Sequence, residues 1–134
     1  MRSNRRTLPG RLMAVGLLLL VGLSACTTGE GSATAEVELA EFWVTPDHDV
    51  LSAGTVELTV ENYGEFPHTL VVSDAAGVVL AATELISPDA ETILSIDLAP
   101  GTYSLTCRIV KGLEDGTVLD HYQKGMVATV DVVG

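Results

Sequence analysis

Apolar and polar residues alternate along most of the chain after residue 35, with a period of two rather than 3.6 residues. This period is typical of strands that bury one face, and turn signals of Gly, Pro and Asn recur between the apolar segments. The predicted strands, in chain order, are residues 36–44, 55–61, 67–74, 77–83, 91–98, 101–109 and 126–133. Seven strands of this length predict an all-β fold in which two sheets pack as a sandwich.

The first 25 residues follow a different pattern, which is that of an export signal. Four arginines within residues 1–11 precede an uninterrupted apolar run over residues 12–23, and small residues follow it. The run is shorter than the roughly 20 residues that a membrane-spanning helix needs. Leu-Ser-Ala-Cys at residues 23–26 resembles the lipobox of bacterial lipoproteins, which implies that Cys26 is the lipidated first residue of the mature chain. An ordinary secretory signal or an uncleaved anchor is the alternative, and each places the folded part outside the cytoplasm.

The rest of the chain divides into a tether and one domain. Residues 26–35 are small and polar without periodicity, which predicts a flexible tether. About 100 residues follow, enough for one ordinary domain with a single core. The expected organisation is a lipoprotein signal peptide over residues 1–25, a tether over 26–35 and a single domain over 36–134.

Cysteine usage gives the first indication of chemistry. If Cys26 carries lipid, Cys107 is the only thiol left in an exported protein, a setting in which cysteines normally pair. A buried Cys acting as a small apolar residue, or a disulfide with Cys26, is the alternative. Neither explains His68, His121 and Met126, which together with Cys107 can build a trigonal His2Cys copper site with a weak axial thioether. Zinc would more usually gather four strong ligands.

Strand parity places three of these residues on apolar faces. Because alternate residues of a strand face the same side, His68, Cys107 and Met126 each share a face with the apolar residue two positions away. All three lie at strand ends. A buried site for a soft metal at one end of a sandwich requires this placement, since thiolate and thioether select copper and apolar surroundings exclude water.

With these residues in place, the chain resembles the cupredoxin, or blue copper, family over residues 36–134. The matching segments are Asn-Tyr-Gly-Glu-Phe-Pro-His-Thr-Leu-Val-Val at 62–72, Ala-Pro-Gly-Thr-Tyr-Ser-Leu-Thr-Cys at 99–107 and His-Tyr-Gln-Lys-Gly-Met at 121–126. The resemblance implies a cupredoxin-like Greek-key β-sandwich of seven to eight strands with one type 1 copper. It also implies equatorial ligation by His68, Cys107 and His121, axial ligation by Met126, and one-electron shuttling without bond-making chemistry.

Two features depart from the family pattern. Residues 108–120 separate Cys107 from His121, where the family usually has a much shorter stretch, and we expect part of it, near Gly112–Gly116, to be an excursion. Its acidic residues, Glu114, Asp115 and Asp120, lie near the end at which the family commonly presents an apolar docking face. The second departure is Thr69, which follows the first His. Many family members carry Asn at this position to brace the Cys loop, and the hydroxyl of Thr69 can make a similar hydrogen bond.

Net charge limits the possible partners, and three further residues have expected roles outside the candidate copper site. Four of the seven basic residues lie in residues 1–25, which leaves three against 18 acidic residues, a formal charge of −15. Nucleic acid and anionic headgroups are therefore disfavoured as partners, and steering toward a basic partner competes with plain solubility as the explanation of the charge. His48 is expected to be an exposed loop residue, with an accessory metal site as the alternative. Phe42 and Trp43 are expected to serve packing.

These observations predict a membrane-tethered, extracytoplasmic blue copper protein, in the periplasm or at the cell surface, that carries single electrons as a monomer to redox partner proteins. A copper storage or delivery protein and a metal-free sandwich that binds a partner are the alternatives. An enzyme is not expected, because the sequence has no Ser-His-Asp set, no carboxylate pair with a cleft signal, no nucleotide motif and no second copper cluster.

Overall fold

The structure is a computed structural model that describes residues 30–134, so the predicted export signal and Cys26 lie outside the described residues. Its strands are β1 (Thr34–Ala40), β2 (Trp43–Pro46), β3 (Val50–Ser52), β4 (Gly54–Asn62), β5 (Val71–Asp74), β6 (Val79–Ala82), β7 (Glu91–Leu98), β8 (Gly101–Thr106), β9 (Val110–Gly112), β10 (Val118–Asp120) and β11 (Val127–Val133). Within residues 30–134 there is no α-helix, and so no helix that could cross a membrane.

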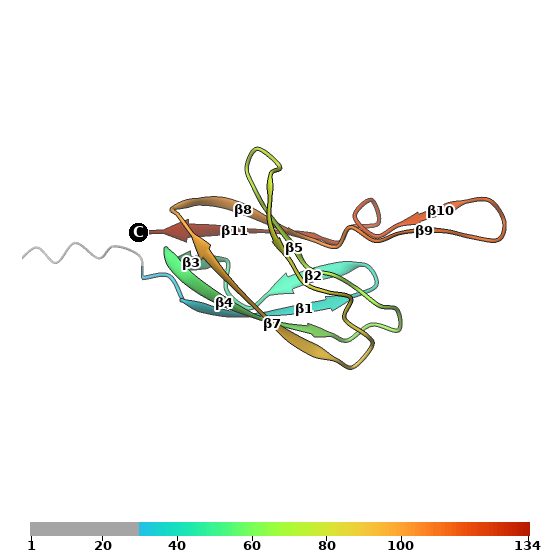
Figure 1. The fold of residues 1–134 in the computed structure, drawn as a ribbon, viewed down its shortest axis with the longest axis horizontal. Coiled ribbons are helices and arrows are strands. Elements are labelled where there is room, and N and C mark those ends of the chain that lie inside the picture. Colours follow the sequence, from blue (N-terminus) through green and yellow to red (C-terminus); the bar gives the residue numbers. More distant parts are fainter. Residues whose placement is uncertain (1–29) are drawn as a thin grey trace, which may run out of the picture.

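The strands form two main sheets, one above the other in Figure 1, and a separate hairpin. One sheet has the order β2-β1-β4-β7, the other has the order β3-β11-β8-β5-β6, and β9 pairs only with β10. Most neighbours are antiparallel, but β1 runs parallel to β4 and β11 runs parallel to β3. The chain crosses repeatedly between the sheets, for example from β4 to β5 and from β7 to β8, which is Greek-key rather than meander connectivity. The predicted all-β sandwich is confirmed.

The core lies between the two sheets and follows from the alternation in the sequence. In β4, Val56, Leu58 and Val60 point inward and are at most 1% exposed, while the residues between them face outward or are half-buried. Leu105 of β8 and Val130 of β11 meet them from the other sheet, each 1% exposed. Burial of each such side chain contributes about 1.5–3 kcal/mol. This core is the rigid support on which the polar residues at one end of the sandwich are mounted.

Residues 30–134 form eleven strands rather than the seven or eight predicted, and the differences arise where short segments change direction. The segment predicted as 36–44 is broken by a turn at Glu41 and Phe42 into β1 and β2. Strand β3 and the β9–β10 hairpin, each of three-residue strands, were not predicted. Such short strands carry too few alternations to be recognised by period.

The boundary between tether and domain also differs from the prediction. Strand β1 begins at Thr34, and Ser32 already forms a parallel bridge with Leu51. The Cβ of any residue other than glycine at Gly31 would overlap the backbone of Leu51 and Ser52, so this approach to the sheet depends on glycine. Residues 32–35 therefore belong to the sandwich, whereas residues 26–29 of the predicted tether lie outside the described residues.

Candidate metal centre

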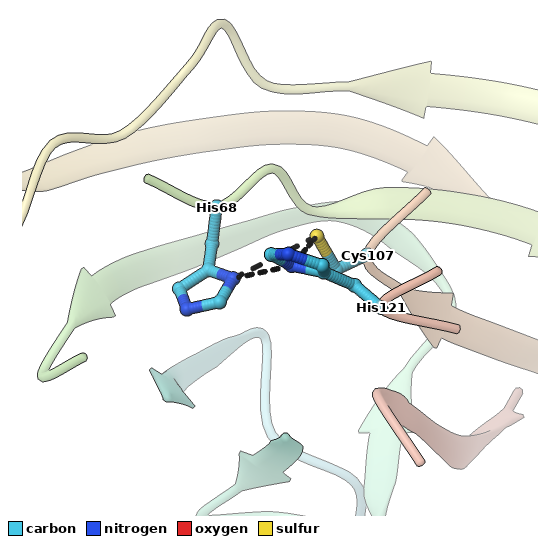
Figure 2. Close-up of side chains that lie close together, drawn as sticks. All are labelled: His68, Cys107 and His121. Carbon is cyan, nitrogen blue, oxygen red and sulfur yellow. Dashed lines mark hydrogen bonds between the residues drawn. The ribbon is translucent and has the colours of Figure 1, made fainter. Parts of the chain in front are cut away.

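His68, Cys107 and His121 meet at one end of the sandwich. Figure 2 shows the two imidazole rings and the sulfur facing one another. The Sγ atom of Cys107 lies 3.8 Å from Nδ1 of His68 and 3.6 Å from Nδ1 of His121, and the two Nδ1 atoms are 3.1 Å apart. The three residues are 0%, 0% and 3% exposed. Two imidazole nitrogens and one thiol sulfur therefore form a compact, buried set of donors.

Sheet pairing brings these residues together from distant parts of the chain. Val71 of β5 pairs with Thr106 of β8, so the residues just outside this pair, including Cys107, lie at the same end of the sheet. His68 is fixed there by a two-way bridge with Ile86, in which each backbone N–H donates to the carbonyl of the other residue, at 3.0 and 2.8 Å. Backbone pairing thus positions both His68 and Cys107 at this end of the sheet.

His121 is returned to the same place by the β9–β10 hairpin. Val110 pairs with Asp120 across the hairpin, and the N–H of His121 donates to the carbonyl of Ile109 at 3.0 Å. Figure 1 shows the hairpin projecting beyond the end of the two sheets. The excursion predicted near Gly112–Gly116 is the turn of this hairpin. The long spacing between Cys107 and His121 is therefore compatible with one site, because the residues of the hairpin pair with each other and project away from the site.

Met126 lies beside the three donors, where the sequence predicted it. It is fully buried, and its backbone is bonded to both neighbouring donor residues. The N–H of Cys107 donates to the Met126 carbonyl at 3.2 Å, and the N–H of Met126 donates to the His121 carbonyl at 3.1 Å. These bonds close residues 121–126 into a tight loop against the end of β8. Coordination by the thioether itself stays a prediction.

Thr69 contacts the sulfur as predicted. Its Oγ1 atom lies 3.8 Å from Sγ of Cys107, within hydrogen-bonding distance for sulfur. A hydroxyl can donate to a thiolate, and hydrogen bonds to the sulfur are among the features that set the potential of a copper–thiolate site. Thr69 thus makes the hydrogen-bonding contact with Cys107 that the sequence predicted.

The turn between β1 and β2 contacts both histidines, and neither contact was predicted. The Nε2–H of His68 donates to Oε1 of Glu41 at 2.8 Å. The ring of Phe42 packs edge-on against the ring of His121, with centroids 5.3 Å apart. The sequence contains one signal for this turn, which is the break in alternation at Glu41 within an otherwise regular apolar pattern. It carries no information about what the carboxylate meets, since its partner is 27 residues away.

Asn62 is a third supporting residue whose role the sequence does not predict. It is fully buried at the end of β4, and its side-chain amide donates to the carbonyls of Phe66 and Ile86 at 2.9 and 3.0 Å. Its Oδ1 atom accepts from the N–H of Gly64 at 2.8 Å. Because the buried amide makes these three hydrogen bonds to the backbone, it fixes the loop that leads into His68.

The electrostatic environment favours the protonation states that bind a metal. Burial raises the pKa of Glu41, but hydrogen bonds from the N–H groups of Phe66 and Glu65 and from His68 outweigh it and lower the pKa to about 2. Burial, together with the nearby His68, lowers the pKa of His121, while Glu41 and Asp120 act in the opposite direction. At neutral pH the carboxylate is therefore charged and His121 is neutral, the form in which imidazole coordinates.

An apolar cavity of about 360 Å³ lies beside His121. Its lining includes Phe66, Leu85, Ile109 and Leu113. The acidic Glu114 and Asp115 lie in the exposed turn of the hairpin. The surface next to His121 is therefore largely apolar. Glu114 and Asp115 lie outward in the turn of the hairpin, whereas Asp120, the third acidic residue expected there, directly precedes His121.

His48 is the one histidine among residues 30–134 that takes no part in the site. Its side chain is 52% exposed, and its Nδ1 lies 2.9 Å from Oδ1 of Asp47. It lies in the loop between β2 and β3. The expectation of an exposed loop histidine is confirmed.

The donor set fits one type 1 copper. Two imidazole Nδ1 atoms and a thiol Sγ lie within 4.8 Å of one another, and Met126 lies nearby. Among residues 30–134 this is the only cluster of three or more His, Cys, Asp or Glu side chains with the spacing of a metal site. A His2Cys set with an adjacent thioether matches the softness and number of ligands that electron-transfer copper uses.

A family model matches most of the chain, including two of the three clustered donor residues. The family model described as a cupredoxin-like domain matches residues 12–119, which include His68 and Cys107 and end before His121 and Met126. A comparison with curated proteins finds no significant sequence match. The assignment of His121 to the site therefore rests on the geometry of the structure.

Several solved structures share the fold. Dithionite-reduced auracyanin from the photosynthetic bacterium Roseiflexus castenholzii is 21% identical, with a TM-score of 0.57 over 78% of this chain and 99% of auracyanin. A mutant plastocyanin of a fern, known in oxidised and reduced forms, is 25% identical, with a TM-score of 0.51 over 73% of this chain and 99% of plastocyanin. A multicopper oxidase is 15% identical, with a TM-score of 0.50 over 74% of this chain and 41% of the oxidase.

Proposed function

The chain belongs to the cupredoxin-like domain family, and on that premise we propose that it is a membrane-tethered blue copper protein that carries single electrons outside the cytoplasm. His68, Cys107 and His121 would be the equatorial ligands and Met126 the axial one. When bound, the copper supplies a one-electron redox couple. The observation that carries the proposal is the convergence of three buried donor atoms from separate segments on one point.

The support around the donors favours electron transfer over loose metal handling. His68, Cys107, His121 and Met126 are each held by backbone hydrogen bonds to other parts of the fold. Residues held in this way move little when the charge on a bound ion changes, so the site is pre-organised for both oxidation states. A storage or delivery site would need donors that release the ion readily, and a buried, backbone-fixed set is poorly suited to that.

The first test is a titration of the purified protein with Cu(II). We expect one equivalent to produce an intense thiolate-to-copper absorption band and an electron paramagnetic resonance spectrum with small hyperfine splitting. Colourless or weakly coloured tetragonal binding would contradict electron transfer and favour copper storage or delivery. Failure to bind copper would leave a metal-free sandwich that binds a partner.

An electron carrier is favoured over an enzyme. The multicopper oxidase that shares the fold is matched over 41% of its chain, so the similarity concerns one portion of that enzyme. The cluster of His68, Cys107 and His121 is the kind of site that a single-copper electron carrier needs.

The surface beside His121 suggests where redox partners dock. The three basic residues outside the export segment, Arg108, Lys111 and Lys124, all lie between Cys107 and Met126, in the part of the chain that builds this end. The same stretch holds three acidic residues, so it is locally neutral, whereas the rest of the chain is strongly acidic. We propose that a partner protein contacts the apolar surface beside His121, and that the acidic remainder steers basic partners during approach.

The location is proposed from the sequence at residues 1–26. Lipid on Cys26 would hold the domain at the outer face of a membrane, in the periplasm or at the cell surface. We expect Cys26→Ser to shift the protein from the membrane fraction to the soluble or unprocessed fraction, since the variant has no thiol to acylate. Fractionation and intact mass would measure this, and a C26S protein with an unchanged lipid mass would exclude lipidation at Cys26.

A further inference from the structure

The position of Glu41 is the most specific feature of the site that the ligand set does not explain. Its side chain is 19% exposed, and its carboxylate accepts three hydrogen bonds. Oε1 accepts from the N–H of Phe66 and from Nε2–H of His68, both at 2.8 Å, and Oε2 accepts from the N–H of Glu65 at 3.0 Å. The carboxylate is thus fixed in one orientation behind the ring of His68.

This contact determines which nitrogen of His68 is free. A carboxylate is an acceptor only, so the proton of the neutral imidazole lies on Nε2, between His68 and Glu41. Nδ1 then carries the lone pair, and it points toward Cys107 Sγ and His121 Nδ1, at 3.8 and 3.1 Å. Glu41 therefore holds His68 in the tautomer that the donor cluster requires, before any metal enters.

The fold reserves space for this carboxylate. A Cβ placed on Gly64 would overlap the carboxylate of Glu41, approaching its Cδ and Oε2 to 2.8 Å. Gly64 is buried, and its N–H is tied to Asn62 Oδ1. The loop that leads to His68 is therefore built around Glu41, with glycine at the point of closest approach and the two backbone donors, from Glu65 and Phe66, directly after it.

From this arrangement we propose that Glu41 is a positioning residue of the copper centre, which fixes His68 through a carboxylate–histidine–copper chain and lowers the reduction potential. The proposal rests on the proposed function. A negative charge that accepts the Nε2 proton increases the electron density on Nδ1 and makes His68 a stronger donor. A stronger anionic donor system favours Cu(II), which carries the higher charge, over Cu(I). The potential is therefore lower than it would be with a neutral residue at position 41.

The principal experiment compares Glu41→Gln with Glu65→Gln. Glutamine keeps the shape and one acceptor oxygen at position 41 but removes the charge, and its amide group would face the N–H of Glu65. We expect E41Q to keep the blue band, to bind Cu(II) about 10- to 100-fold more weakly, and to have a higher reduction potential. Each tenfold loss of preference for Cu(II) over Cu(I) raises the potential by about 59 mV.

The E65Q variant is the matched control, because it removes the same charge from the adjacent loop while Glu65 contributes only its backbone N–H to Glu41. We expect E65Q to behave as the wild type. Equal potentials and equal Cu(II) affinities in E41Q and E65Q would overturn the proposal. Gly64→Ala is a second variant that displaces the carboxylate without changing its charge, and it should shift the potential in the same direction as E41Q; an unchanged potential in G64A would also count against the proposal.

A copper-free measurement separates this proposal from the proposed function. Nitrogen-15 NMR of the copper-free protein should show His68 protonated at Nε2, with that proton protected from exchange, and should show weaker protection in E41Q. Protonation of His68 at Nδ1 would overturn the role of Glu41 whether or not copper binds. Conversely, absence of a blue band in the wild type with an Nε2-protonated His68 would contradict the electron-transfer function and leave the positioning of His68 intact.

Discussion

Cys107→Ser should abolish the intense blue colour of the copper-loaded protein. The colour arises from charge transfer between a thiolate and Cu(II), and Cys107 provides the one thiol sulfur in the cluster with His68 and His121. A hydroxyl at this position stays protonated near neutral pH and is a much weaker ligand for copper than a thiolate. We expect the absorption band to disappear and residual copper to give a spectrum with large hyperfine splitting. Visible absorption and electron paramagnetic resonance after addition of one equivalent of Cu(II) would measure both changes.

The other cysteine provides a matched control for this substitution. Cys26→Ser makes the same chemical change at the cysteine that is not part of the donor cluster, and we expect it to leave the blue band intact. We expect C107S to fold, since the buried serine hydroxyl would have Thr69 and two imidazoles within hydrogen-bonding reach. Circular dichroism would check this. A folded C107S protein that keeps the blue band would show that Cys107 is not the thiolate ligand.

Much of the fold and the donor set could be predicted from the sequence because both depend on local patterns. Period-two alternation identified the longer strands, such as β4 and β7, since every second residue must enter the core. The candidate donors were predicted for a different reason, which is that Cys, His and Met in this order and spacing match the ligand set of an electron-transfer copper site. Sheet register then brought His68 and Cys107 together, as the placement of both at strand ends had predicted.

The parts that could not be predicted depend on contacts between distant segments. Glu41 is an ordinary charged residue in the sequence, and its role becomes visible only when the turn after β1 meets the loop before β5, 27 residues further on. The β9–β10 hairpin is equally hidden, because strands of three residues have no measurable period. Asn62 shows the same limit, since an amide at a strand end is more often exposed than buried.

These unpredicted residues share one property: they support the ligands and are themselves held by backbone groups. Glu41 is fixed by the N–H groups of Glu65 and Phe66, and Asn62 is fixed by the carbonyls of Phe66 and Ile86 and the N–H of Gly64. Loop residues 62–68 are therefore fixed by a shared set of hydrogen bonds, and this fixed loop holds His68 in place. In contrast, His121 is held by backbone bonds of the hairpin and by the edge-on ring of Phe42. The two histidines thus have different surroundings, one charged and one apolar.

Met126→Leu should keep the blue colour and raise the reduction potential. Leucine has nearly the same volume as methionine, and such exchanges in a buried position usually cost less than about 1.5 kcal/mol, so the fold and the three strong donors should persist. The substitution removes a weak thioether donor, which stabilises the higher charge of Cu(II) more than that of Cu(I). If Cu(II) loses tenfold more affinity than Cu(I), the potential rises by about 59 mV. Protein voltammetry would measure the change.

The direction in which a second substitution shifts the reduction potential distinguishes a ligand role of Met126 from a packing role. Met126→Gln places an oxygen donor at the same depth, and an oxygen at the axial position favours Cu(II) more strongly than a thioether does, so its potential should fall below that of the wild type. Because Met126 is fully buried and its backbone is bonded to both Cys107 and His121, a purely structural role would disturb both variants through the same loop and move the potentials in one direction. Opposite shifts would identify Met126 as the axial ligand, and an unchanged potential in M126L would assign it to the apolar core alone.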